Sequence, residues 1–283
     1  MKQKERRSRP AGPALSNWCR ACKVERDNLL PSEAFVLGLV VADLERIGRL
    51  RKHATLCDRH GQFPHRPGVD ARTMKQVFLI RHGESESNAG GRTHAPHATG
   101  ITARGQVQAG RLATLWNFGE PQLIVTSPFV RTQHTAMPFI ERYPSARREE
   151  WSVEEFTQLC PREWLGTTHV DRAPKVTEYW ERSDPHYCDG PGAESFTTLF
   201  KRVRGLLSRA CETKEDHIVV FTHGTFMQAV MWACLFNSCP DTSEAMAAFF
   251  RFSQIAPIDN TAVLPLVRHD SHWSVGTIRQ PVV

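Results

Sequence analysis

The chain has 283 residues, of which 40% are apolar, and a mean hydropathy of −0.40. These values are typical of a folded globular protein and exclude a disordered or fibrous chain. No apolar run approaches the ~20 residues of a membrane helix. The basic first ten residues lack the apolar core of a secretory leader, and eight cysteines are too few for a disulfide scaffold. We therefore expect a cytoplasmic protein with reduced thiols and no membrane association.

The N-terminal quarter of the chain differs in charge from the rest. Residues 1–75 hold sixteen Lys or Arg and eight Asp or Glu, a net charge of +8, whereas the whole chain has +6. The polar, turn-rich segment 67–73 marks a boundary. It predicts a basic accessory segment over residues 1–70 and a larger domain over residues 74–283. The accessory segment is either a solvated tail or a binding site for an acidic partner or nucleic acid, and no nucleic-acid module supports the latter.

Apolar residues at helical spacing predict one helix in the accessory segment, from Ser32 to Arg51. A Cys-x-x-Cys pair and a Cys-x-x-His pair flank this helix, each with the spacing that lets two side chains reach one tetrahedral Zn²⁺. The candidate metal ligands are Cys19, Cys22, Cys57 and His60. A structural zinc would supply folding free energy to a one-helix segment. However, the 34 residues between the pairs exceed the spacing of compact zinc modules, so free thiols are the alternative.

Beyond residue 74, short apolar strands alternate with helices. Three segments are apolar throughout and rich in β-branched residues, as strands buried on both faces tend to be: 76–80, 122–126 and 217–221. Each leads towards a predicted helix, over residues 103–116, 129–143 and 225–236 respectively. Two late strands, 261–267 and 272–278, form a predicted hairpin. This order predicts an α/β fold with helices packed on a sheet.

Polar residues follow the three buried strands, at the edge where ligands bind in open α/β sheets. The first strand is followed by Arg81, His82 and Gly83. The second strand leads to Arg131, and the third is followed by His223 and a further glycine. Glycine allows close backbone approach, and a helix N-terminus offers unpaired N–H groups to an anion. Two histidines and two arginines at one edge therefore indicate a phosphate-binding site.

Five segments of the larger domain carry distinctive motifs. They are LIRHGESESN (79–88), TGITARGQVQAGRLA (99–113), SPFVRTQHTA (127–136), GAESF (192–196) and VVFTHG (219–224). Together and in this order they resemble the histidine phosphatase superfamily, the phosphoglycerate-mutase-like group, over about residues 76–275. The resemblance implies a three-layer α/β/α sandwich with a mostly parallel sheet. It also implies catalysis of phosphoryl transfer, with no cofactor required.

The resemblance assigns roles to residues that fit the chemistry. His82 would attack phosphorus and form a phosphohistidine that water hydrolyses, which divides one difficult step into two. Arg81 and Arg131 would each hold two phosphate oxygens, because a guanidinium stays charged and binds in a bidentate manner. His223 and Asn88 would complete the phosphate site. Neighbouring guanidinium groups disfavour the charged form of His82 and keep its attacking nitrogen available.

The resemblance also implies that a glutamate in the segment 147–159 gives the leaving group its proton. We favour Glu155, because it precedes an aromatic residue and an apolar run that could keep it protonated, and Glu154 is the alternative. The segment 168–192 is long, aromatic and turn-rich, so it is interpreted as a cap or substrate loop over the pocket. Its basic residues could select an acidic substrate or could be ordinary exposed charges.

The predicted reaction is hydrolysis of a phosphate monoester. A phosphoglycerate-type mutase is an alternative, but the family's mutase motif is only superficially matched at residues 141–143, inside the predicted helix of Arg131. Another alternative is a non-catalytic protein that binds a phosphorylated ligand or a partner, with a zinc-binding basic module. The substrate is a small phosphorylated molecule or a phosphoprotein, and the sequence leaves the oligomeric state open.

Overall fold

The computed structural model describes residues 74–93, 95–237, 240–270 and 272–279. The accessory segment, with its predicted helix and its four candidate zinc ligands, lies outside the described residues. All statements below concern the described part of the chain. Within it, no helix is both long enough and apolar enough to cross a membrane.

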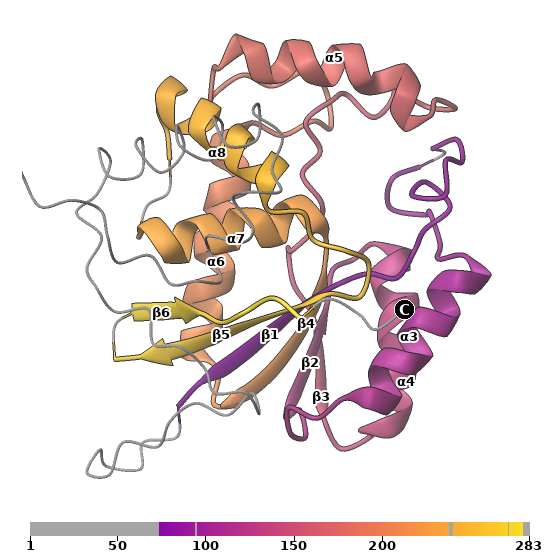
Figure 1. Cartoon of the computed structure of the whole chain (residues 1–283), viewed down its shortest axis with the longest axis vertical. Helices are drawn as coiled ribbons and strands as arrows, with labels where there is room; N and C mark the ends of the chain where they lie inside the picture. The colour runs from indigo at the N-terminus through magenta and orange to yellow at the C-terminus, as the bar shows by residue number, and fades with distance from the viewer. Residues whose placement is uncertain (1–73, 94, 238–239, 271, 280–283) are drawn as a thin grey trace, which may run out of the picture. The chain divides into compact units, whose positions relative to one another are not determined.

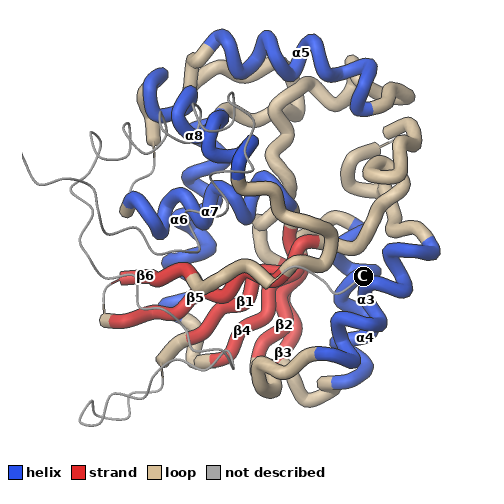
Figure 2. Tube along the Cα trace, in the orientation of Figure 1, coloured by secondary structure: helices blue, strands red, loops and turns tan. Residues whose placement is uncertain are grey.

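The described residues form one mixed six-stranded sheet (Figures 1 and 2). In chain order the strands are β1 (Gln76–Arg81), β2 (Leu123–Thr126), β3 (Arg147–Glu150), β4 (His217–Thr222), β5 (Val263–His269) and β6 (His272–Val275). Their spatial order is β3-β2-β4-β1-β5-β6. The four strands from β3 to β1 are parallel, and β5 and β6 add to the β1 edge in antiparallel pairs.

Helices cover both faces of this sheet (Figure 1). They are α3 (Ala103–Leu115), α4 (Val130–Arg142), α5 (His169–Arg182), α6 (Phe196–Glu212), α7 (Gly224–Phe236) and α8 (Ser243–Ile255). The first two lie on one face, and α6 and α7 lie on the other. Helix α8 packs on α7, and α5 packs on α8. The three-layer α/β/α sandwich implied by the resemblance is thus confirmed.

The central strands are apolar throughout because both of their faces are buried. In β1, Val77 and Leu79 contribute to the core under α6 and α7, whereas Phe78 and Ile80 contribute to the core under α3 and α4. Successive side chains of a strand point to opposite faces, so one apolar run serves both cores. Strands β2 and β4 alternate in the same way. Both cores therefore fix the sheet from which the polar strand ends emerge.

The strands and helices predicted beyond residue 74 are found with ends that differ by up to three residues, the largest difference being the end of β6 at Val275. The exception is the segment 168–192, which was interpreted as a loop but contains the 14-residue helix α5. Thr168 starts this helix through a capping box: its hydroxyl accepts from the Asp171 N–H, and the Asp171 carboxylate accepts from the Thr168 N–H. Tyr179 and Trp180 are buried against the core, which holds the helix in place.

Candidate active site

The parallel pairing of β1 with β4 brings the two predicted histidines together. Arg81 pairs with Thr222 in the register, so His82 and His223 both follow the last paired residues. The N–H of His82 donates to the Thr222 carbonyl at 3.0 Å, and the two imidazole centroids lie 5.2 Å apart. The side chains are buried, with exposed fractions of 3% and 0%. Two segments 141 positions apart in the sequence thus form one site.

The His82 ring is oriented by its own neighbour. Its Nδ1 lies 2.7 Å from the Gly83 carbonyl oxygen, which can only accept, so Nδ1 carries the hydrogen. Burial, and then the charges of Arg131 and Arg81, hold the pKa of His82 well below its usual value of 6.5. The ring is therefore neutral at physiological pH, and Nε2 keeps its lone pair. This is the state in which an imidazole acts as a nucleophile.

Glycine at position 83 is needed because the backbone of α3 approaches closely. A Cβ at Gly83 would lie 2.7 Å from the carbonyl oxygen of Gly105, a distance that real Cβ atoms do not adopt. The Gly83 N–H donates to the buried Thr135 hydroxyl at 3.0 Å, and that hydroxyl donates to the Arg131 carbonyl at 2.6 Å. Thr135 therefore connects the turn after β1 to the helix that carries Arg131.

The two predicted arginines lie beside the histidines. Arg131 donates to the Pro96 carbonyl at 2.6 Å, and its guanidinium lies 4.8 Å from the centroid of the Phe129 ring. Burial lowers the pKa of Arg131 to about 10, Glu155 opposes this shift, and Arg81 adds to it. Burial likewise lowers the pKa of Arg81. Both guanidinium groups remain charged near pH 7 and face the same small region.

Arg81 is held against the start of α7. It donates through Nη1 to the Ile258 carbonyl at 2.5 Å. The guanidinium lies close to Gly224, the first residue of α7, where a Cβ would be in van der Waals contact with Arg81 Nε at 3.4 Å. The buried Nε atom has no hydrogen-bond partner among the described residues. An unpaired buried donor is costly, and an anion is a suitable acceptor for it.

His223 has a partner that the sequence analysis did not identify. Its Nε2 lies 2.9 Å from the hydroxyl of buried Ser127, which also accepts from the Phe129 N–H at 3.1 Å. Its Nδ1 is buried and has no partner in the part of the chain that the structure describes. Burial, Arg131 and His82 hold the pKa of His223 well below 6.5. Because Ser127 directly follows β2, the strand-end rule that revealed the histidines could have revealed it.

Asn88 is oriented by hydrogen bonds from Ser85 and from the distant Asn260. Its side-chain oxygen accepts from the Ser85 N–H at 3.3 Å, from the Ser85 hydroxyl at 3.1 Å and from Asn260 Nδ2 at 3.1 Å. Asn260 also donates to the His82 carbonyl at 2.9 Å. These bonds use the oxygen of Asn88 and place its amide group close to the His82 backbone. Its NH₂ group is the part left to donate to a ligand.

The two candidate acids have different surroundings. Glu155 accepts from the Thr225 N–H at 3.1 Å, at the N-terminus of α7, and its charge acts on Arg81 and Arg131. Glu154 instead forms an ion pair with Arg202 of α6, at 3.3 Å. Glu155 thus belongs to the electrostatic environment of Arg81 and Arg131, whereas Glu154 forms its ion pair with α6.

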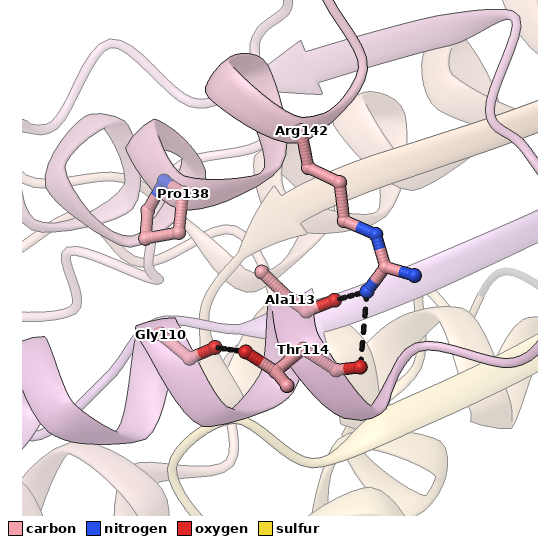
Figure 3. Close-up of a pocket in the computed structure, with 5 residues that line it drawn as sticks. All are labelled: Gly110, Ala113, Thr114, Pro138 and Arg142. Atoms are coloured by element: carbon pink, nitrogen blue, oxygen red, sulfur yellow. Dashed lines mark hydrogen bonds between the residues drawn. The ribbon is translucent and has the colours of Figure 1, made fainter.

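A separate shallow hollow lies between α3 and α4 (Figure 3). It is lined by Gly110, Ala113, Thr114, Pro138 and Arg142. Arg142 reaches across it and donates to the Ala113 and Thr114 carbonyls. Arg142 follows Arg131 by eleven residues in one helix, which is roughly 16 Å at 1.5 Å per residue. The hollow is therefore remote from the histidines and contains no group suited to their chemistry.

The described residues contain no group of three or more His, Cys, Asp or Glu side chains arranged to hold a metal ion. The histidine and arginine cluster is instead suited to an anion, since the charges that act on His82 are those of the Arg131 and Arg81 guanidinium groups.

Comparison with known proteins gives the family. Residues 77–279 match the model of the histidine phosphatase superfamily (branch 1). Phosphoserine phosphatase 1 of Hydrogenobacter thermophilus is 29% identical over 168 residues, which cover 57% of this chain and 77% of that protein. The adenosylcobalamin/alpha-ribazole phosphatase of Escherichia coli is 28% identical over 153 residues, covering 52% and 73%.

A solved structure shows the same fold. The putative alpha-ribazole-5'-P phosphatase of E. coli superimposes with a TM-score of 0.58 at 22% identity, covering 73% of this chain and 96% of that one. The chain therefore belongs to the histidine phosphatase superfamily, and it is an enzyme of the phosphatase type.

Proposed function

We propose that the protein hydrolyses a phosphate monoester through a phosphohistidine intermediate on His82. The observation that carries this proposal is the state of the ring. Its Nδ1 hydrogen is bound to the Gly83 carbonyl, and its pKa is held well below 6.5, so a neutral imidazole presents the Nε2 lone pair. A histidine that only bound phosphate would do so better in its protonated, positively charged form.

The phosphoryl group is held by the surrounding cationic and polar side chains. Arg81 and Arg131 neutralise charge on the non-bridging oxygens as it develops, which is the main catalytic contribution available in phosphoryl transfer. His223 is positioned by Ser127, and Asn88 is positioned by Asn260. Both add hydrogen bonds to the same oxygens. The site therefore stabilises a transferring phosphoryl group without a metal ion.

The reaction has two steps, and one carboxyl group, that of Glu155, gives a proton in the first step and takes one up in the second. In the first step His82 Nε2 forms a bond to phosphorus, the P–O ester bond breaks, and the leaving oxygen takes a proton from Glu155. In the second step water attacks the phosphohistidine, Glu155 takes a proton from that water, and inorganic phosphate leaves. His82 and Glu155 return to their initial states.

Hydrolysis fits the site better than mutase chemistry. The Glu-Arg-Tyr sequence that superficially resembles the mutase motif ends α4, and Arg142 binds backbone carbonyls of α3 there. Arg142 is therefore unavailable to a substrate at His82. A purely phosphate-binding protein has no need of a neutral, oriented imidazole. We propose a small phosphorylated molecule or a phosphoprotein as the substrate.

The accessory segment is the basis of a separate proposal. Its Cys and His pairs would hold a structural zinc ion, with Cys19, Cys22, Cys57 and His60 as ligands. Elemental analysis of the full-length protein, purified without chelator, is expected to find one zinc per chain. Zinc-free protein would leave these cysteines as free thiols.

Turnover of p-nitrophenyl phosphate without added metal tests the proposed reaction. The wild-type protein is expected to release phosphate, and His82→Ala is expected to abolish the release. His186→Ala is the matched control, since His186 is exposed on the segment after α5 and outside the site. Unchanged turnover in His82→Ala would eliminate the nucleophile, and equal loss in both variants would indicate a general effect on folding.

A further inference from the structure

The loop after β1 and the segment before α5 are joined by backbone hydrogen bonds. The Thr93 N–H donates to the Thr167 carbonyl at 2.8 Å, and the Gly166 N–H donates to the Thr93 carbonyl at 2.7 Å. Arg92 extends this contact by donating to the Gly166 carbonyl at 2.6 Å. Two segments that are more than 70 positions apart in the sequence thus lie side by side, and the contact between them is called this edge below.

His169, the first residue of α5, shows that this edge borders the phosphate site. Its Nε2 lies 3.1 Å from the Ser87 hydroxyl, and its Nδ1 lies 3.3 Å from Arg172 Nη2. The pKa of His169 is lowered by burial first, then by Arg172 and Arg81, whereas Glu155 opposes the shift. The charges of two residues of the site therefore act on this ring. Sequence analysis missed His169, because an isolated polar residue at a helix start gives no signal.

The positive charge of this edge is only partly neutralised. Neither Arg92 nor Arg172 forms an ion pair within the described ranges. Arg172 is fixed by the Thr167 carbonyl and hydroxyl, both at 2.9 Å. The acidic groups on the same two segments are Glu84, which pairs with Arg104, the exposed Glu86 and Glu163, and Asp171. The Asp171 carboxylate accepts from Thr168, and its charge also acts on Arg92 and Arg172.

The other two basic residues of α5 are different. Lys175 lies 3.1 Å from the Glu178 carboxylate and 3.8 Å from that of Asp189. Arg182 pairs with Glu178 at 3.4 Å and lies 4.0 Å from the centroid of the Tyr187 ring. The charges of Lys175 and Arg182 are therefore neutralised by acidic residues of the same segment, 168–192. Of the basic residues on α5, Arg172 is therefore the one placed to act on a substrate.

We propose that Arg92 and Arg172, the latter oriented by its contact with His169 Nδ1, bind a second anionic group of the substrate, beside the phosphate that is held at His82. This inference rests on the proposed phosphatase function and narrows its substrate class to phosphate monoesters that carry a further acid. Arg92 and Arg172 are called the anionic-group site below. One charge-assisted hydrogen bond at a partly exposed site is expected to change kcat/KM about tenfold, equivalent to about 1.4 kcal/mol.

Matched substrate pairs test the anionic-group site. In one pair, 3-phosphoglycerate is compared with glycerol 3-phosphate, which lacks the carboxylate. In the other, 1,3-propanediol bisphosphate is compared with the monophosphate. We expect the wild-type protein to prefer the doubly acidic member of at least one pair by about tenfold in kcat/KM, and the preferred pair identifies the acid as carboxylate or phosphate. Arg172→Gln should remove most of that preference, and Arg172→Lys should restore part of it.

The controls separate specificity from folding. Arg182→Gln, on the same helix, should keep the wild-type preference. Arg92→Gln is a second test if Arg172→Gln folds poorly, since Arg92 is exposed and the structure gives its side chain one backbone contact. Equal turnover of both members of both pairs by the wild-type protein overturns the proposal. A preference that survives in Arg172→Gln and in Arg92→Gln overturns it as well.

Binding measurements distinguish failure of this inference from failure of the proposed function. Calorimetric titration of the four compounds into His82→Ala measures preference without turnover. Preferential binding of the acidic members, without any hydrolysis by the wild-type protein, would refute the phosphatase function and retain the anionic-group site. Hydrolysis of p-nitrophenyl phosphate without any preference would retain the function and refute the site.

Discussion

Thr135→Val tests whether the hydroxyl between Gly83 and Arg131 maintains the site. The substitution keeps the shape of the side chain but removes the acceptor for the Gly83 N–H, 3.0 Å away, and the donor to the Arg131 carbonyl, 2.6 Å away. This N–H belongs to the peptide bond between His82 and Gly83. The carbonyl group of the same glycine orients the His82 ring.

The magnitude follows from burial. Thr135 is fully buried, so the Gly83 N–H loses its partner where no solvent replaces it. Leaving one such group unpaired costs about 1–3 kcal/mol. In a domain of this size, 1 kcal/mol shifts Tm by roughly 2–4 °C, so Thr135→Val is expected to lower Tm by roughly 2–12 °C.

Thermal unfolding followed by circular dichroism provides the measurement, and α3 provides the control. The Thr114 hydroxyl donates to the Gly110 carbonyl four residues earlier, just as Thr135 donates to Arg131, but Thr114 is exposed. Thr114→Val should change the free energy of unfolding by no more than about 0.5 kcal/mol. Equal effects of the two substitutions would refute the role of the buried hydrogen bond.

Three further predictions concern the acid, the histidines and a close backbone contact. Glu155→Gln should slow phosphoenzyme formation from an alkyl phosphate, measured in a single turnover, about 10²–10⁴-fold, but formation from p-nitrophenyl phosphate much less, because p-nitrophenolate needs no proton; equal slowing of this first step would exclude Glu155 as the acid. The pKa values of His82 and His223 lie well below 6.5 in the folded protein, so below pH 6.5 the unfolded chain binds more protons than the folded one. The free energy of unfolding therefore falls as pH drops below 6.5, by up to roughly 1.4 kcal/mol per pH unit for each histidine. Denaturant titrations that give the same free energy of unfolding from pH 6.5 to 5 would contradict this. Gly105→Ala places a Cβ 2.3 Å from a backbone carbonyl oxygen and should lower Tm, whereas Gly110→Ala, with open space in the same helix, should raise it; the opposite order would refute the contact.

Much of the fold could be predicted because local sequence and burial agree. The strands β1, β2 and β4 are continuous apolar runs, and their pairing brings residues from distant segments to one edge. Three of the candidate site residues, Arg81, His82 and His223, could therefore be placed at this edge from the strand ends, and Arg131 from the start of the helix that follows β2. The antiparallel hairpin of β5 and β6 was also predicted, since two strand-like segments flank a polar turn.

Other elements escaped prediction for different reasons. Strand β3 consists of Arg-Arg-Glu-Glu, which has little strand character and becomes a strand by pairing with β2. The helices α6 and α8 do have readable signals: Ser195 caps α6, and its apolar side chains recur at helical spacing. These two helices do not directly follow a predicted strand, so the alternation of strands and helices gave no reason to expect them.

The finer parts of the site depend on long-range contacts. The contrast between Glu155 and Glu154 arises from α7 and Arg202, which no local pattern reveals. Asn260 reaches His82 and Asn88 from more than 170 positions away. Such contacts follow from the assembled sheet, so a sequence motif predicts the residue types and the fold decides their partners.

Rapid-quench labelling tests the central claim most directly. The wild-type protein is mixed with a phosphate monoester labelled in its phosphoryl group, quenched in alkali within milliseconds, and mapped by peptide analysis. The account predicts acid-labile, alkali-stable label on His82, formed and lost fast enough for turnover, and no label in His82→Ala. Label on His223 instead, or full turnover of substrate with His82 unmodified at every time point, would contradict it.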